Sequence, residues 1–156
     1  MKKLALILLS LIPGLVLAQP SMEIKHNLYE VGQQALQDNK PIVLFFNASY
    51  CLPCTKLKER ALSAIIRFEH YPAGTQFVEV FIDSDQELID FYNQAISAEE
   101  FALFYNIVEL PSLVFLDGNG NSIARPIINN GAYEFFSALL NSRLESGLEK
   151  LNHPKD

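Results

Sequence analysis

The chain has 156 residues, of which 18 are acidic and 12 are basic, and its net charge is −6. This length suits one domain. The acidic excess argues against nucleic acid or an anionic membrane surface as the partner, since both would repel the chain. The presence of only two cysteines and three histidines also limits the metal sites that the chain could build.

The first 18 residues have the pattern of a secretory signal peptide. Lys2 and Lys3 precede an apolar run over 4–17, and small or modest residues lead to Ala18. The run is shorter than the roughly 20 apolar residues of a spanning helix, although an uncleaved N-terminal anchor stays open as the alternative. We therefore expect residues 1–18 to be removed on export and residues 19–156 to form one domain in an oxidising compartment.

The rest of the chain alternates between extended and helical patterns. Residues 19–25 fit either a short first strand or an extended arm. Apolar positions at helical spacing predict helices, and short apolar runs bounded by turn residues predict strands. In chain order, the further predicted elements are a helix over 28–37, a strand over 42–46, a helix over 55–66, a strand over 76–82, helical structure in one or two pieces over 86–106 with a fresh start at Ser97, a strand over 112–116, a strand over 123–128 and a helix over 133–148.

The order of these elements predicts the fold class. Helices between successive strands imply parallel pairing, whereas the short turn over 117–121 implies an antiparallel pair at the end. Pro126 favours an edge position for the last strand, because proline cannot donate a backbone hydrogen bond. The sequence therefore predicts an α/β fold with a central mixed β-sheet flanked by helices on both faces.

The two cysteines, Cys51 and Cys54, stand where the strand over 42–46 leads into a helix. The first turn of a helix has unpaired backbone N–H groups and the positive end of the helix dipole. A thiol at that place is stabilised as the thiolate, which is the form that attacks disulfides. We therefore assign Cys51 as the attacking thiol and Cys54, one turn further along, as the resolving thiol.

Three other uses of a cysteine pair are weighed against this assignment. A zinc site needs two further ligands, and His26, His70 and His153 are scattered along the chain. Haem attachment needs a histidine directly after the second cysteine, where this chain has Thr55. A purely structural disulfide would close too short a loop to stabilise the fold much, because the gain grows with loop length. The spacing therefore favours thiol–disulfide exchange.

Three features together resemble the thioredoxin-like superfamily, in its exported bacterial branch. The first is the unit of strand, Cys-Leu-Pro-Cys and helix, with Tyr50 where thioredoxin usually has tryptophan. The second is Leu110-Pro111 just before a strand, which matches the cis-proline loop of that family. The third is the terminal arrangement of strand, Asp-Gly turn, strand and helix. The resemblance covers residues 22–148.

This resemblance implies a periplasmic protein-disulfide oxidoreductase with a thioredoxin-like fold and a cis bond before Pro111. The redox-active disulfide Cys51–Cys54 would itself carry the electrons, so no bound cofactor and no metal are expected. The implied partners are disulfide-containing exported proteins and a membrane thiol-reductant donor. No separate dimerisation domain precedes the cysteines, so we expect a monomer. Five residues are expected to bind an extended substrate peptide: Tyr50, Leu52, Pro53, Leu110 and Pro111.

The direction of exchange is argued from the two residues inside the motif. DsbA-type oxidants and disulfide isomerases commonly have a histidine there, whereas Leu52-Pro53 places proline second, as in thioredoxin. This favours a reductase over an oxidase. A client-specific redox chaperone for cytochrome or metal-site assembly stays open as an alternative, as does a non-enzymatic metal-binding module.

The sequence departs from thioredoxin near the cysteines. The family often has a buried aspartate six residues before the first cysteine, where this chain has Phe45, and Glu79 takes the place of a lysine on the neighbouring strand. A carboxylate in an apolar run is costly unless exposed or partnered, so a solvated edge position is the alternative to a buried one. Our hypothesis is that Glu79 replaces the aspartate as the proton acceptor for Cys54. The charged residues of the cysteine helix fall opposite its apolar stripe and are expected to be solvated: Lys56, Lys58, Glu59 and Arg60.

Overall fold

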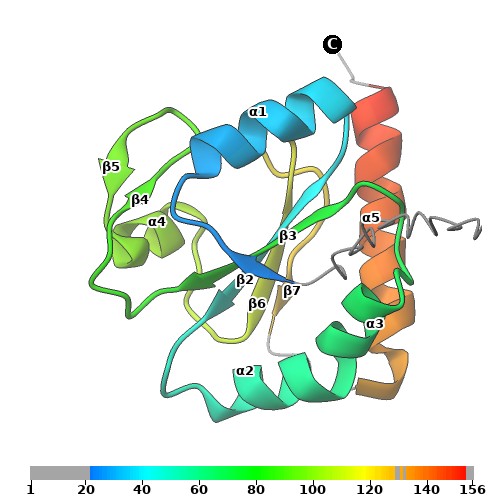
Figure 1. Ribbon diagram of the computed structural model, residues 1–156. Coiled ribbons are helices and arrows are strands. Elements are labelled where there is room, and N and C mark those ends of the chain that lie inside the picture. The colour runs from blue at the N-terminus through cyan, green and yellow to red at the C-terminus, as the bar shows by residue number, and fades with distance from the viewer. Residues whose placement is uncertain (1–21, 129–130, 132, 154–156) are drawn as a thin grey trace, which may run out of the picture.

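The computed structural model describes residues 22–128, 131 and 133–153 (Figure 1). The predicted signal peptide over 1–18 lies outside the described residues. Within the described part of the chain, no helix combines the length and the apolar character needed to cross a membrane.

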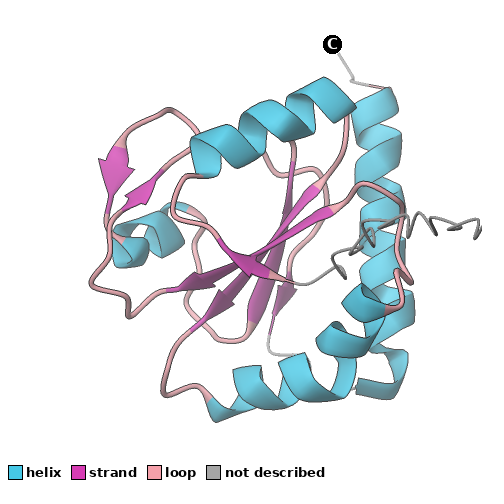
Figure 2. Cartoon of the chain, in the orientation of Figure 1, coloured by secondary structure: helices cyan, strands magenta, loops and turns pink. Residues whose placement is uncertain are grey.

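A five-stranded mixed sheet forms the centre of the molecule, with the strand order β1-β3-β2-β6-β7 (Figure 2). Both β1 and β2 run parallel to β3, whereas β6 is antiparallel to β2 and β7 is antiparallel to β6. All six residues of β2 are buried, as expected for a short apolar run at the middle of a covered sheet. The strands of this sheet are β1 (Glu23–Ile24), β2 (Ile42–Asn47), β3 (Gln76–Phe81), β6 (Ser112–Leu116) and β7 (Ile127–Ile128).

Helices cover both faces of the sheet, which confirms the predicted fold class (Figure 1). Alternate residues of a strand point to opposite faces, so Val43 and Phe45 join the core beneath the cysteine helix, while Leu44 and Phe46 join the other core. One face carries α1 (Leu28–Asp38) and α4 (Ala98–Phe104). The other carries α2 (Leu52–Leu57), the π-helical segment η1 (Lys58–Leu62), α3 (Ser63–Arg67) and α5 (Phe136–Asn152), which follows the 3₁₀ turn η2 (Tyr133–Phe135).

The helix after the cysteines changes its winding at Lys58. The backbone N–H of Ser63 donates to the carbonyl of Lys58, five residues earlier, which closes a π turn rather than an α turn. A π turn takes one more residue than an α turn, so it shifts which side chains face the sheet. The side chains that follow this π turn are therefore not placed as a regular helix of the same sequence would place them.

The prediction of helical structure over 86–106 is wrong in its first half. That half forms a small hairpin of β4 (Leu88–Ile89) and β5 (Ala95–Ile96). Its turn is closed by the carboxylate of Asp90, which accepts the backbone N–H groups of Tyr92 and Gln94, both at 2.8 Å. An aspartate that satisfies backbone donors in this way competes with helix formation.

The second half forms α4, and its predicted start at Ser97 is confirmed. The Ser97 hydroxyl accepts the Glu100 backbone N–H, and the Glu100 carboxylate reaches back to the Ser97 N–H, which is a capping box. Two other boundaries differ from the prediction. Of the predicted strand over 123–128 only β7 forms, and a single bridge joins Leu116 to Ser122 just before it. The last helix runs on to Asn152.

Candidate functional site

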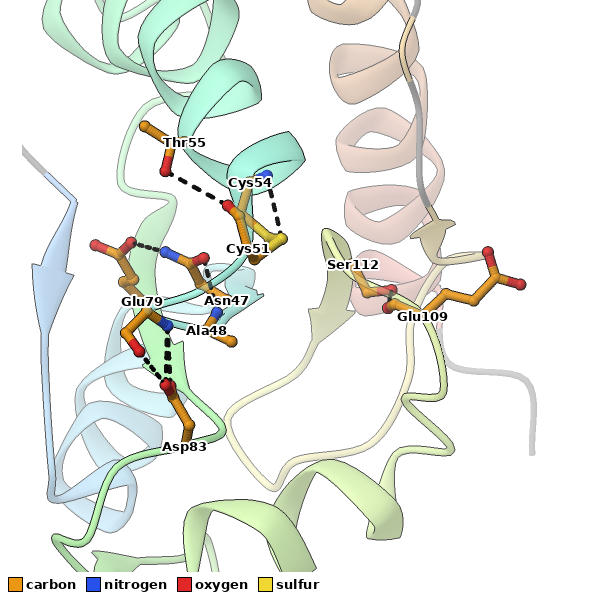
Figure 3. Close-up of a disulfide and its surroundings, with 10 residues drawn as sticks. Asn47, Ala48, Cys51, Cys54, Thr55, Glu79, Asp83, Glu109 and Ser112 are labelled. Atoms are coloured by element: carbon orange, nitrogen blue, oxygen red, sulfur yellow. Dashed lines mark hydrogen bonds between the residues drawn. A yellow bond between two sulfur atoms is a disulfide. The ribbon is translucent and has the colours of Figure 1, made fainter.

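Cys51 and Cys54 form a disulfide at the start of α2, with their Cα atoms 5.3 Å apart (Figure 3). Cys51 is the residue that caps the helix, and its sulfur accepts the backbone N–H of Cys54 at 3.2 Å. Cys51 is 7% exposed, whereas Cys54 is fully buried. A backbone donor aimed at the outer sulfur favours negative charge there. The geometry therefore distinguishes an outer sulfur from a shielded inner one.

The expected substrate-binding residues lie on two loops beside this disulfide. Tyr50, Leu52 and Pro53 are exposed around the start of α2. The Leu110–Pro111 peptide bond is cis, Pro111 is buried, and Leu110 packs against the core that contains both cysteines. The strand order β3-β2-β6 brings the end of β2, which leads to the cysteines, next to the start of β6. The cysteine pair therefore has exposed apolar residues at the start of α2 and the half-buried Leu110 with the buried Pro111 on the other loop.

Glu79 lies buried on β3, with 2% of its surface exposed, directly beside Phe45 of β2 in the parallel register. Its Oε1 accepts Asn47 Nδ2 at 2.8 Å, and its Oε2 contacts the ammonium of Lys58 at 2.5 Å. The solvated edge position is therefore excluded for Glu79. The expectation that Lys58 is solvated is wrong, because its side chain, 37% exposed, is paired with a carboxylate on another element.

Asn47 connects this carboxylate to the loop before the cysteines. Its Oδ1 accepts the backbone N–H of Ala48 at 2.7 Å, and the carbonyl of Ala48 accepts the N–H of Cys51 at 3.0 Å. Figure 3 shows Glu79 and Asn47 on one side of the cysteine pair and the turn of Glu109 and Ser112 on the other. In that turn the Ser112 hydroxyl donates to the Glu109 carbonyl at 2.7 Å.

A second carboxylate also holds the loop. Asp83, just after β3, accepts the backbone N–H of Ser49 with both oxygens, at 3.0 and 3.1 Å, and accepts the Ser49 hydroxyl as well. The hydrogen bond from the Ser49 hydroxyl is the main cause that lowers the pKa of Asp83 from its ordinary value of 3.8. Sequence analysis did not single out Ser49, Asp83 or Asn47. A usable signal existed only for Asn47, the one polar residue at the end of a buried apolar strand.

A cavity of about 350 Å³ lies beside this network, at the edge formed by β1 and β3. Glu79, Ser49 and Asp83 line it together with residues next to β1, including His26. The Glu79 carboxylate therefore borders this cavity, which lies on the β1 side of β3. Among the described residues, no group of three or more His, Cys, Asp or Glu side chains is placed to hold a metal ion.

Comparison with known proteins places the chain in a family. A family model for a thioredoxin-like domain matches residues 28–135. A curated protein of Chlamydia pneumoniae, named disulfide bond reductase DsbH, is 33% identical over 97 residues, which cover 62% of this chain and 57% of that protein. The matched stretch thus spans less than two thirds of the length of this curated relative.

Solved structures show the same fold at lower identity. A DsbH oxidoreductase matches with a TM-score of 0.62 and 21% identity, over 90% of this chain and 95% of that one. A thioredoxin-fold protein from Helicobacter pylori gives 0.57 and 23%, over 76% of each chain. Thioredoxin O2 from Arabidopsis thaliana in its oxidised state gives 0.53 and 17%, over 79% and 96%. The chain belongs to the thioredoxin-like domain family and has its fold.

Proposed function

We propose that the chain is a thiol–disulfide oxidoreductase in which Cys51 and Cys54 exchange a disulfide with a protein substrate. The observation that carries this proposal is the capping position of Cys51, whose sulfur accepts the Cys54 N–H while Cys54 itself is buried. Membership of the thioredoxin-like family supports it, as does the name of the curated relative, a disulfide bond reductase.

In the reducing direction the reaction has two steps. The Cys51 thiolate attacks a substrate disulfide, which forms a mixed disulfide and releases one substrate thiolate. Cys54 then loses its proton and attacks the Cys51 sulfur, which forms the Cys51–Cys54 disulfide and releases the second substrate thiolate. Two electrons pass from the cysteine pair to the substrate, and both released thiolates take protons from solvent. The cysteine pair is then reduced again by an external thiol donor.

We assign the substrate surface to the two loops around the disulfide. Tyr50 and Leu52 are 74% and 61% exposed and flank Cys51, so they offer apolar surface directly beside the disulfide. With Pro53 they stand on one side of the cysteines, and Leu110 and Pro111 belong to the other loop. An extended peptide from the substrate would lie between these loops, with its disulfide above Cys51.

Reduction is the proposed direction, because Leu52-Pro53 supplies no histidine to stabilise the reduced form. Proteins with less oxidising motifs have potentials of roughly −270 to −180 mV, against about −120 mV for a strong oxidant. Equilibration of the purified protein with glutathione buffers of known ratio would measure this potential. A value near that of the strong oxidant would contradict the reductase assignment but not the exchange chemistry.

We further propose that the domain over 19–156 acts as a monomer in the periplasm after removal of residues 1–18, and receives electrons from a membrane thiol donor. The support is the charge and apolar pattern of the first 18 residues. Mass spectrometry of protein from the periplasmic fraction should find a chain that begins at Gln19. An intact N-terminus in the membrane fraction would indicate the anchored alternative.

Trapping of the mixed disulfide tests the proposed function directly. Cys54→Ala removes the resolving thiol, so substrates should stay linked to Cys51 when the variant is expressed in an exporting host. A reductant should release them, and the double variant Cys51→Ala/Cys54→Ala should capture none. Many captured proteins would indicate a general reductase, whereas one dominant protein would indicate a client-specific chaperone. No linked protein at all would contradict the proposal.

Glu79 is proposed as the proton acceptor for Cys54 in the second step. Its support is burial on the sheet face that the cysteine helix covers, at the strand position beside Phe45. General base assistance is worth roughly 10²- to 10⁴-fold in rate. Glu79→Gln should therefore slow resolution of the mixed disulfide much more than its formation. If Glu79→Gln slowed formation and resolution of the mixed disulfide equally, Glu79 would not be the proton acceptor for Cys54.

A further inference from the structure

Lys58 and Asn47 hold the Glu79 carboxylate from two sides. Lys58 Nζ contacts Oε2 at 2.5 Å, and Asn47 Nδ2 donates to Oε1 at 2.8 Å, so each oxygen has a partner of its own. Lys58 stands four residues after Cys54, and its backbone N–H donates to the Cys54 carbonyl. The Lys58 side chain therefore links the cysteine helix to the strand beneath it, and Asn47 links the same carboxylate to the backbone of Ala48, in the loop that leads to Cys51.

The charges around Glu79 make Lys58 its direct counter-ion. Lys25 and His26, next to β1, and Asp83, after β3, line the same cavity as Glu79. Asp83 is engaged by Ser49, and the ammonium that contacts the Glu79 carboxylate is that of Lys58. Glu79 is 2% exposed, and a buried carboxylate is costly unless it is paired and hydrogen-bonded, as it is here by Lys58 and Asn47.

We propose that Lys58 is a positioning residue for the resolving step: it keeps Glu79 ionised and oriented, so that the carboxylate can accept the proton of Cys54. Asn47 fixes the other oxygen and aligns the carboxylate with the loop before Cys51. This inference rests on the proposed exchange function and extends it to a residue outside the motif.

Resolution of the mixed disulfide moves one proton and exchanges one S–S bond for another. Cys54 S–H gives its proton to the Glu79 carboxylate, and the Cys54 thiolate attacks the Cys51 sulfur. The Cys51–Cys54 bond forms, the bond from Cys51 to the substrate breaks, and the substrate leaves as a thiolate. Glu79 then returns its proton to solvent through the cavity that it lines. If Glu79 were already protonated, this acceptor would be lost and resolution would slow.

The test follows the two steps separately in a stopped-flow experiment. The reduced protein is mixed with an aryl disulfide that releases one coloured thiolate when the mixed disulfide forms and a second when Cys54 resolves it. Lys58→Met removes the counter-ion, and Lys58→Arg keeps it. Lys56→Met is the matched control, because Lys56 is an exposed lysine of the same helix. Glu79→Gln and the double variant Lys58→Met/Glu79→Gln complete the set.

Lys58→Met should slow the second phase at neutral pH by about tenfold or more, within the range for loss of a general base, and the rate should recover as pH rises. Lys58→Arg and Lys56→Met should keep the wild-type pH profile. The double variant should match Glu79→Gln alone, since the lysine acts through the glutamate.

Two outcomes would overturn the proposal. One is a Lys58→Met profile that coincides with that of the wild type, even if the variant is less stable. The other is that Lys58→Met slows the second phase by the same factor in the Glu79→Gln background as in the wild type. Lys58 would then act independently of Glu79. A wild-type protein that releases no coloured thiolate in either phase would instead contradict the exchange function itself, so the two failures are distinguishable.

Discussion

Ser49 donates both its backbone N–H and its hydroxyl to the carboxylate of Asp83, which ties the loop before Cys51 to the end of β3. With the Asn47 contact to Glu79, this makes two attachments of one loop to one strand. Both partners are carboxylates, Glu79 on β3 and Asp83 just after it. Asp83 accepts a backbone N–H of the loop directly, whereas Glu79 acts through Asn47, which accepts the N–H of Ala48. The loop before Cys51 is therefore held by two carboxylates from one side of the sheet.

The first prediction concerns Asp83. Its pKa is lowered mainly by the hydrogen bond from the Ser49 hydroxyl, so the ionised form is favoured in the folded state. Such a group stabilises the fold above the unfolded value of 3.8, and the contribution is lost as pH falls through the lower folded value. The wild type should therefore exceed Asp83→Asn in urea resistance at neutral pH, and the two should converge in acid. Parallel curves at all pH values would contradict this.

The second prediction concerns Tyr105, whose hydroxyl donates to the Gly120 carbonyl at 2.9 Å. Tyr105→Phe keeps the ring contacts with Phe101 and Phe104 but removes this bond, which should cost about 1 kcal/mol of unfolding free energy. Burial is the main cause that raises the pKa of Tyr105 above its ordinary value of 10.0. Stability from this group is complete below pH 10 and is lost as pH rises further. The advantage of wild type over Tyr105→Phe should therefore shrink in alkali, as urea titrations at several pH values would measure.

The sequence predicted the fold because its strongest signals are local. The apolar run before Cys51, the helical spacing after it and the Asp-Gly turn each identify one element, and their order identifies the sheet. The hairpin of β4 and β5 was missed because its apolar spacing also fits a helix. What decides the hairpin is the side chain of Asp90, which bonds two backbone N–H groups of the turn.

The environment of Glu79 could not be predicted for a different reason. Its partners, Asn47 and Lys58, are 32 and 21 residues away in the sequence, and only the folded sheet and helix bring them together. Lys58 itself follows Cys54 by a regular helical turn, but nothing local in the sequence indicates that its ammonium reaches a carboxylate on β3. The sequence thus located the cysteines and Glu79, but not the two side chains that hold the Glu79 carboxylate.

The third prediction concerns the two thiols of the reduced protein. Cys51 is 7% exposed and its sulfur accepts the Cys54 N–H, whereas Cys54 is fully buried. Brief alkylation at mildly acidic pH should therefore label Cys51 first, and peptide mass spectrometry would locate the label. In the single variants, Cys51→Ala should react more slowly than Cys54→Ala by about tenfold or more, because thiolate character and access both favour the outer sulfur. Faster labelling of Cys54 would reverse the assigned roles.

The last prediction concerns Phe45 and Glu79, which are paired in the parallel register of β2 and β3. Phe45 is fully buried, so any polar replacement loses roughly 3–5 kcal/mol of packing. Phe45→Asp and Phe45→Asn have nearly the same shape and differ in charge. At neutral pH, Asp should be the more destabilising of the two, because it places a second carboxylate beside Glu79.

Addition of Glu79→Gln should remove or reverse the stability difference between Phe45→Asp and Phe45→Asn. In that background, Lys58 would have the carboxylate at position 45 as its partner. Urea unfolding of the four proteins, oxidised so that the disulfide is intact, gives the coupling energy, which we expect to be about 1–3 kcal/mol. If the variants with Phe45 replaced do not fold at neutral pH, the Asp variant should regain stability relative to the Asn variant in mild acid, where one carboxylate is protonated. A difference between Asp and Asn that is the same with glutamate or glutamine at position 79 would mean that the two positions do not interact. The fold could then hold a carboxylate at position 45 and another at position 79 at the same time.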